Sequence, residues 1–338
     1  MRPFDYSRAV DAPDAVRAAG APAESHERSP VQLMGGGTTL LDLMKLDVMR
    51  PTAVVDITGL DAARYGRIEV TPAGLRLGAL VRMSEAAEHP AVVADYPVIA
   101  QTLAMAASAQ LRNMARLGGN VLQRTRCNYF RDPSYGQCNK RDPGSGCAAL
   151  DGANRLHAVL GVSDACIAHY PGDFAQGLIA FDAMVEVLGP RGPRSLAFAD
   201  LHRLPGRTPH IETTLSPGEL ITAFVIPAGA WTRRSVYTKV RDRDSYAFAL
   251  ASAAVALDMD GATVRSARIA LGGVASVPWR AREAEALLAG GVLDEASATR
   301  AAKAAFAGAK VHRDNAYKVP LGEATVVRAL LTAQALKV

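Results

Sequence analysis

The alternation of apolar and polar positions changes character after a linker at residues 227–232. Before the linker, apolar runs of strand length are interleaved with segments of helical periodicity. Strands are predicted at 31–34, 52–57, 75–79 and 220–227, helices at 12–19, 40–46 and 98–109, and a helix running into a strand at 177–187. This mixture indicates an α+β protein.

After the linker, residues 235–240 alternate in polarity, and two longer apolar segments flank Asp258-Met259-Asp260-Gly261, which is a hairpin signal. Those segments are 247–257 and 263–271, and helical periodicity follows at 280–289, 296–306 and 323–336. The pattern predicts an antiparallel sheet backed by helices. We therefore expect two domains, residues 1–228 and residues 233–338.

The length of the chain supports two domains, because 338 residues are more than a single hydrophobic core usually contains. The chain is 49% hydrophobic and 21% charged, as in globular proteins. A net charge of +5 suggests a basic patch facing an anionic ligand, whereas nucleic acid would need a more concentrated basic face. No apolar run is long enough for membrane insertion, and residues 1–10 do not resemble a secretory signal.

Two glycine-rich segments are candidates for ligand binding. Gly35-Gly36-Gly37-Thr38-Thr39 follows a predicted strand and precedes a predicted helix. Consecutive glycines leave backbone N–H groups open to an anion such as a pyrophosphate. A plain strand–turn–helix connection is the alternative, and a Rossmann fold is disfavoured because no GxGxxG fingerprint is present. The second segment, Gly118-Gly119-Asn120, could face the same elongated ligand from the other side.

All four cysteines, Cys127, Cys138, Cys147 and Cys166, fall in one polar stretch within 40 residues. Free cysteine prefers apolar burial, so four unrelated thiols are disfavoured, and the clustering indicates a metal rather than a disulfide framework. Structural zinc usually takes cysteines in close pairs, and no CxxC occurs. Wide spacing suits an iron–sulfur cubane. The spacing alone leaves both an iron–sulfur cluster and zinc possible.

Three motifs together resemble a known family. They are Gly-Gly-Gly-Thr-Thr-Leu-Leu-Asp-Leu-Met-Lys at 35–45, the stretch from Arg112 to Asn120, and Gly-Asp-Phe-Ala at 172–175 with Ala-Phe-Asp-Ala at 180–183. The chain resembles the FAD-binding medium subunit of the xanthine dehydrogenase and aldehyde oxidoreductase family along nearly its whole length. This resemblance implies a two-part FAD-binding domain of the PCMH (vanillyl-alcohol oxidase-like) type. It also implies a carboxy-terminal domain like that of the carbon monoxide dehydrogenase flavoprotein.

The cysteine stretch, at about residues 124–168, resembles an insertion in periplasmic-type aldehyde oxidoreductases and in 4-hydroxybenzoyl-CoA reductase. In those proteins the insertion holds a [4Fe-4S] cluster. The resemblance therefore implies that Cys127, Cys138, Cys147 and Cys166 are the ligands of such a cluster.

The resemblance also implies roles for individual residues in FAD binding. The first loop should hold the pyrophosphate, the second should line the other side, and Asp173 should accept hydrogen bonds from FAD hydroxyls, although it could be a simple turn carboxylate. Ile221 should contact the isoalloxazine, and Lys239 should lie near the ring unless it is a solvated strand lysine. Arg116 stands where many family members have Thr or Ser. The complete set is Met34, Gly35, Gly36, Gly37, Thr38, Thr39, Leu40, Leu41, Arg116, Gly118, Gly119, Asn120, Gln123, Asp173, Ile221 and Lys239.

The implied function is electron transfer within a heterotrimeric molybdenum enzyme, most simply an aldehyde oxidoreductase. Its partners would be a molybdopterin-binding large subunit and a [2Fe-2S] small subunit, and no catalytic acid–base pair is expected on this chain. The alternatives are a stand-alone FAD oxidase of the same fold and an interaction subunit with a structural zinc. The expected compartment is the cytoplasm, or the periplasm by co-export with a partner that carries a signal.

Overall fold

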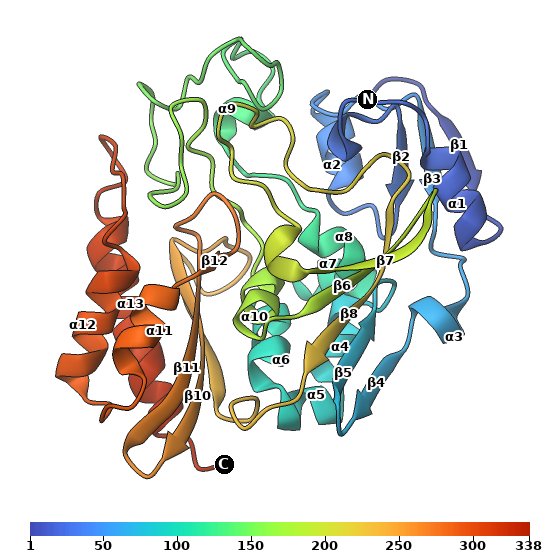
Figure 1. Ribbon diagram of the computed structural model, residues 1–338. Helices are drawn as coiled ribbons and strands as arrows, with labels where there is room; N and C mark the ends of the chain where they lie inside the picture. The colour runs from blue at the N-terminus through green and yellow to red at the C-terminus, as the bar shows by residue number, and fades with distance from the viewer.

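The computed structural model covers residues 1–338 and contains three β-sheets (Figure 1). The first sheet is parallel, with the strand order β1-β3-β2. It consists of β1 (Asp5–Arg8), β2 (Val31–Met34) and β3 (Ala53–Asp56), with α1 (Ala12–Ala19), α2 (Leu40–Lys45) and α3 (Ala62–Tyr65) beside or following its strands. Asp11 caps α1 by accepting a hydrogen bond from the backbone N–H of Asp14, 2.7 Å away. The first glycine loop connects β2 to α2.

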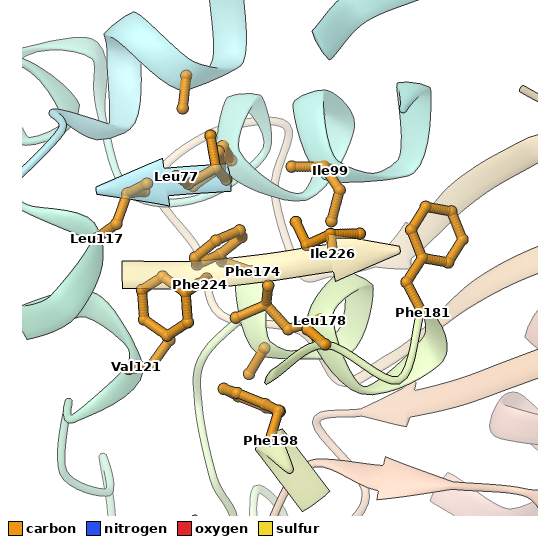
Figure 2. Close-up of a cluster of buried hydrophobic side chains, with 14 of the residues drawn as sticks. Leu77, Ile99, Leu117, Val121, Phe174, Leu178, Phe181, Phe198, Phe224 and Ile226 are labelled. Carbon is orange, nitrogen blue, oxygen red and sulfur yellow. The ribbon is translucent and has the colours of Figure 1, made fainter. Parts of the chain in front are cut away.

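The second sheet is antiparallel and has the order β4-β5-β8-β6-β7. Its strands are β4 (Ile68–Thr71), β5 (Gly74–Gly78), β6 (Met184–Gly189), β7 (Gly192–Ala197) and β8 (Leu220–Pro227). The helices of this part are α4 (Met83–Glu88), α5 (Pro90–Asp95), α6 (Pro97–Ala104), α7 (Ala109–Met114), α8 (Leu117–Val121) and α10 (Phe174–Ala180). Figure 2 shows Phe174 and Leu178 of α10 packed against Phe224 and Ile226 of β8 in the largest hydrophobic core.

The third sheet, with the order β12-β11-β10-β9, forms the carboxy-terminal part. It contains β9 (Ser235–Val240), β10 (Ala251–Asp260), β11 (Thr263–Gly272) and β12 (Trp279–Arg280), with α11 (Arg282–Leu288), α12 (Glu295–Ala305) and α13 (Lys318–Gln334). These helices bury one face of the sheet in a core of their own, whereas α6 and α10 contact strands of the same sheet from the other part of the chain (Figure 1). None of the helices is both long enough and apolar enough to cross a bilayer.

The structure corrects two local predictions. The helix predicted at 98–109 is broken, because α6 ends at Ala104 and Ala107 has a positive φ of 49°. Ser108 then starts α7 by accepting a hydrogen bond from the backbone N–H of Leu111 at 3.3 Å. The second glycine segment, expected as an open loop, lies within the short helix α8. Gly118 fits there because an added Cβ would lie only 3.0 Å from the Cβ of Ala79.

An ion-pair hub joins the carboxy-terminal part to the rest of the chain. Asp182 follows α10 and pairs with Arg268 of β11, with Arg280 of β12 at 3.0 Å and with Arg282 of α11 at 3.4 Å. The side chain of Arg280 is only 8% exposed, so its charge depends on protein partners rather than on water. Asp182 therefore stabilises the contact between α10 and the third sheet.

Replacing Asp182 by asparagine should lower the free energy of unfolding by roughly 1–3 kcal/mol, because the guanidinium groups of Arg268 and Arg280, which are 16% and 8% exposed, would lose an anionic partner that is itself 44% exposed. Urea unfolding measures this change. The matched control is Asp260→Asn, which breaks an ion pair with Arg265 whose two side chains are 69% and 58% exposed. Exposed pairs contribute about 0–1 kcal/mol, so equal effects of the two substitutions would contradict the assignment.

Candidate functional site

One large cleft of about 900 Å³ lies where the first glycine loop, the second glycine segment and the carboxy-terminal part meet. Most of the residues predicted for the site line it, which brings together segments that are about 80 residues apart in the sequence. They are Met34, Gly35, Gly36, Gly37, Thr38, Thr39, Leu40, Arg116, Gly119, Asn120, Gln123 and Asp173. The cleft has the size of a small-molecule or cofactor site.

The first glycine loop presents free backbone donors to this cleft. None of the backbone N–H groups from Gly35 to Thr39 donates a hydrogen bond within the protein, whereas the N–H of Leu41 is bonded to the carbonyl oxygen of Gly37 at 3.1 Å. Gly37 also has a φ of +70°, a conformation that favours glycine. Successive unpaired N–H groups of this kind form an anion-binding concavity.

The first glycine segment contacts the end of α7, shortly before the second segment, at Gly36. A Cβ added to Gly36 would lie 2.0 Å from the carbonyl oxygen of Met114, so only glycine allows this approach. Gly119 behaves differently, because an added Cβ would meet nothing within 4 Å. Gly36 therefore allows the first loop to lie against the end of α7, and Gly119 leaves room in the cleft.

The cleft walls carry charged side chains of both signs and unsatisfied polar atoms. Five arginines line them, namely Arg116, Arg124, Arg126, Arg131 and Arg243, together with the carboxylates of Glu27, Asp42, Asp173 and Asp242. Burial lowers the pKa of Arg116 and of Arg126, but an arginine remains charged at neutral pH. Arg116 Nε, Arg126 Nε, Asn120 Oδ1 and His169 Nε2 are buried without a hydrogen-bond partner. Buried polar atoms are normally paired, so these atoms fit the contacts of a polar, anionic ligand.

Asp173 and Lys239, both predicted to bind FAD, bind each other in the structure. Lys239 Nζ lies 2.7 Å from Asp173 Oδ2 and 3.0 Å from the carbonyl oxygen of Met105, and Tyr237 donates its hydroxyl to Asp173 Oδ1 at 2.5 Å. Burial raises the pKa of Asp173, and the ammonium group of Lys239 opposes that shift. Asp173 lines the cleft, whereas Lys239 lies behind it and joins β9 to the segment before α10.

Leu41, Gly118 and Ile221 also lie outside the lining of the cleft. Ile221 belongs to β8 and is buried in the core, where it is 3% exposed. The sequence prediction missed the connection between β9 and β10, which lines the cleft through Asp242, Arg243, Tyr246, Ala247, Phe248, Ala249 and Leu250. The sequence feature that could have indicated this connection is the charged and aromatic run that follows β9. Within it, Tyr246 has a positive φ of 53°.

The cysteine insertion forms the loops at the top of Figure 1, and its only helix is α9 (Asn128–Arg131). All four cysteines are free thiols and line one small cavity of about 10 Å³. The backbones of Cys138 and Cys147 form an isolated antiparallel β-bridge. Cys127, Cys138 and Cys166 belong to one buried apolar cluster. No group of three or more His, Cys, Asp or Glu side chains is arranged to hold a metal ion. The structure thus gathers the four thiols around one cavity, in an arrangement that does not itself form a metal site.

Burial makes Cys127, Cys147 and Cys166 hard to ionise. It raises the pKa of Cys127 to about 12 and that of Cys166 to about 11, and it raises the pKa of Cys147. Backbone N–H groups act in the opposite direction, from Tyr129 and Phe130 at Cys127 and from Ala168 at Cys166. N–H groups directed at sulfur stabilise a thiolate, which is the form that binds a metal.

A segment of the carboxy-terminal part, residues 310–318, holds the end of the insertion, and we call it the clamp. Asn154 and Asp314 exchange two hydrogen bonds of 3.1 and 2.8 Å. Lys318, which is fully buried, donates to the carbonyl oxygens of Leu156 at 3.1 Å and Gly273 at 2.6 Å. Desolvation lowers the pKa of Lys318 from 10.5 to about 7. The clamp therefore fixes the insertion against the third sheet through a buried amine.

Lys318 should make stability depend on pH. Between pH 7 and 10.5 the unfolded chain retains a proton that the folded chain has lost, so the free energy of unfolding should rise with pH, by at most about 1.4 kcal/mol per unit. In Lys318→Met this contribution should vanish, so its stability should increase less than that of the wild type between pH 7 and 9. Urea unfolding across this range measures the difference. Parallel pH profiles for wild type and Lys318→Met would contradict it, and Lys310→Met, an exposed lysine of the clamp, is the control.

Two family models match the chain. The model described as the FAD binding domain in molybdopterin dehydrogenase matches residues 2–229, and the CO dehydrogenase flavoprotein C-terminal domain matches residues 235–333. Among curated proteins, the aldehyde oxidoreductase FAD-binding subunit PaoB of Escherichia coli is 46% identical and covers 99% of both sequences. The carbon monoxide dehydrogenase medium chain of Afipia carboxidovorans is 27% identical and covers 88% of this chain and 84% of its own length.

Solved structures give the same fold. A chain of the Cu,Mo-CO dehydrogenase in its cyanide-inactivated form superposes with a TM-score of 0.75 at 25% identity and covers 99% of each chain. A chain of quinoline 2-oxidoreductase from Pseudomonas putida 86 superposes with a TM-score of 0.73 at 23% identity, covering 99% of this chain and 98% of its own. The whole length of the chain is thus similar to known proteins.

Proposed function

The chain belongs to the family of FAD-binding subunits of xanthine dehydrogenases and aldehyde oxidoreductases, and on this basis we propose that it carries FAD and a [4Fe-4S] cluster within an aldehyde oxidoreductase. The observation that carries the FAD assignment is the convergence of both glycine segments on one cleft. The aldehyde assignment is supported by the 46% identity with a subunit named for that activity. Electrons from partner subunits would leave through this chain to an external acceptor.

We propose that the free N–H groups of Gly35 to Thr39 hold the pyrophosphate, with Gly119 and Asn120 facing it across the cleft. The buried, unpartnered Oδ1 of Asn120 fits a donor on the ligand. Arg116 and Arg126 offset the ligand's negative charge. When bound, FAD would supply two-electron redox chemistry, and the protein supplies binding, orientation and electrostatics. The predicted contacts of Leu41, Gly118, Gln123, Asp173, Ile221 and Lys239 with FAD are part of this proposal.

The four cysteines fit a cluster by their chemistry. They are unpaired thiols that share one cavity, and backbone N–H groups are directed at Cys127, Cys147 and Cys166. Metal binding would compensate for the cost of ionising these buried sulfurs. The cavity of about 10 Å³ requires the thiols to spread outward when a cluster binds. Structural zinc is the competing occupant.

We further propose that the FAD-binding domain spans residues 1–228 and the carboxy-terminal domain residues 233–338. The partners would be a molybdopterin-binding large subunit and a [2Fe-2S] small subunit. Support comes from the family model, whose description refers to a molybdopterin dehydrogenase. The complex would work in the cytoplasm, or in the periplasm if a partner carries the export signal.

One purification tests the proposal. The chain is isolated with its partner subunits, its visible spectrum is recorded, and its iron, zinc and flavin contents are measured. We expect FAD and iron. Zinc without iron would favour the structural-zinc alternative, and zinc without FAD would end the whole proposal. Aldehyde oxidation by the isolated chain would instead favour a stand-alone oxidase.

A further inference from the structure

A buried histidine contacts one of the four cysteines. His157 Nε2 lies 3.1 Å from Cys127 Sγ, and His157 is only 4% exposed. The other ring nitrogen, Nδ1, is buried and has no hydrogen-bond partner. His157 thus has a single polar contact through its side chain, and that contact is with a sulfur atom.

The direction of this hydrogen bond follows from the state of the sulfur. A metal-bound thiolate has no proton and can only accept, so the imidazole must present Nε2–H to it. A neutral imidazole carries its single proton on either ring nitrogen, so Nε2 can be the donor in this contact. A hydrogen bond to a cluster sulfur withdraws negative charge from it and raises the reduction potential of the cluster.

The clamp keeps His157 in place from both sides of its backbone. Lys318 Nζ donates a hydrogen bond to the carbonyl oxygen of Leu156 at 3.1 Å. Asn315 Nδ2 donates one to the carbonyl oxygen of Ala158 at 3.1 Å. The backbone N–H of His157 donates to the carbonyl oxygen of Asn154 at 2.9 Å. The carbonyl groups that flank His157 are therefore bound by the carboxy-terminal part, which positions the ring against Cys127.

We propose that His157 is a positioning residue of the cysteine site: it donates Nε2–H to the Cys127 thiolate, and the clamp holds it there, so that the carboxy-terminal part sets the reduction potential of the cluster. This inference rests on the proposed cluster. His157 is not one of the metal ligands in this arrangement, because all four ligand positions are taken by cysteines.

The test compares His157→Leu and His157→Gln in the complete complex, purified with its partner subunits. Leucine removes the donor, whereas the glutamine amide can place an N–H near the position of Nε2. The measurements are iron and FAD per chain and the midpoint potential of the cluster from a redox titration followed by EPR. We expect iron and FAD to stay at wild-type levels in both variants. The midpoint potential should fall in His157→Leu and return towards the wild-type value in His157→Gln.

The control is His312→Gln, a half-buried histidine of the clamp, which should leave the potential unchanged. Should His157→Leu not fold, His157→Asn replaces it, because its shorter amide falls short of Cys127 Sγ. An unchanged potential in the donor-free variant would overturn the inference. Loss of iron from both His157→Leu and His157→Gln would also overturn it, by showing that His157 is a ligand. Wild-type complex without iron would refute the proposed cluster, and this inference with it.

Discussion

Gly119→Val should yield a folded protein that has lost most of its FAD. The Cβ of residue 119 points into open space, since no atom lies within 4 Å of it, and Gly119 lines the cleft. Its backbone is helical, and valine is tolerated in a helix better than glycine. The added methyl groups should therefore cost little stability but occupy space that FAD needs. We expect the FAD content after dialysis to fall at least tenfold, which corresponds to about 1.4 kcal/mol of binding free energy or more.

The control for this substitution is Gly136→Val, because a Cβ at this exposed position in the cysteine insertion also meets nothing within 4 Å. It should keep its FAD. Gly36→Ala would be a poorer test, since the new Cβ would collide with the carbonyl oxygen of Met114 and disturb folding as well as binding. Wild-type FAD content in Gly119→Val would show that the ligand does not lie between the two glycine segments.

The fold was predictable wherever local signals mark the ends of an element. The predicted helix at 12–19 and the predicted strands at 31–34 and 220–227 coincide with α1, β2 and β8. For α1 the local signal is clear, because Asp11 caps the helix and Pro13 lies in its first turn. The predicted fold class, a flavin-binding α+β domain followed by a CO dehydrogenase flavoprotein-like domain, is confirmed by both family models and by the solved structures.

Tertiary packing explains where sequence prediction of the elements failed. An alanine-rich run at 98–109 looks like one helix, yet the chain must turn after α6 to bring α8 against Ala79 of the second sheet region. Two glycines in α8 contradict helix propensity, and Gly118 is required there because the helix packs closely against Ala79. Such close approaches depend on residues distant in sequence, so no local pattern indicates them.

The candidate site was likewise predicted from the sequence only in part. The glycine segments were found from the sequence because each is a continuous run whose backbone chemistry can be inferred directly. The loop around Arg243 and Tyr246 was missed, because it reaches the cleft only when the third sheet packs on α10. The pairing of Asp173 with Lys239 was also invisible, since it joins residues 66 positions apart. Residue types alone could not distinguish a ligand contact from a structural ion pair.

Cys138→Ser should remove the iron from the complex and leave the flavin absorption largely intact. A serine hydroxyl is a poor ligand for iron, so a cluster held by four cysteines should lose its metal. The loop should survive, because Asn139 Oδ1 accepts hydrogen bonds from the backbone N–H groups of Gly144 and Gly146 at 3.1 and 2.9 Å. No residue lines both the cysteine cavity and the cleft, so FAD binding should persist.

Iron and FAD are measured per chain in the purified complex, together with the spectrum before and after reduction. Tyr135→Phe is the control, since Tyr135 is an exposed residue of the same insertion and is not among the residues lining the cysteine cavity. Iron content equal to the wild type in Cys138→Ser would show that this cysteine is not a ligand. Loss of zinc instead of iron would assign the insertion a structural metal. The clamp and the third sheet hold the insertion independently of the sulfurs. The metal content of Cys138→Ser would therefore be measured on a folded protein.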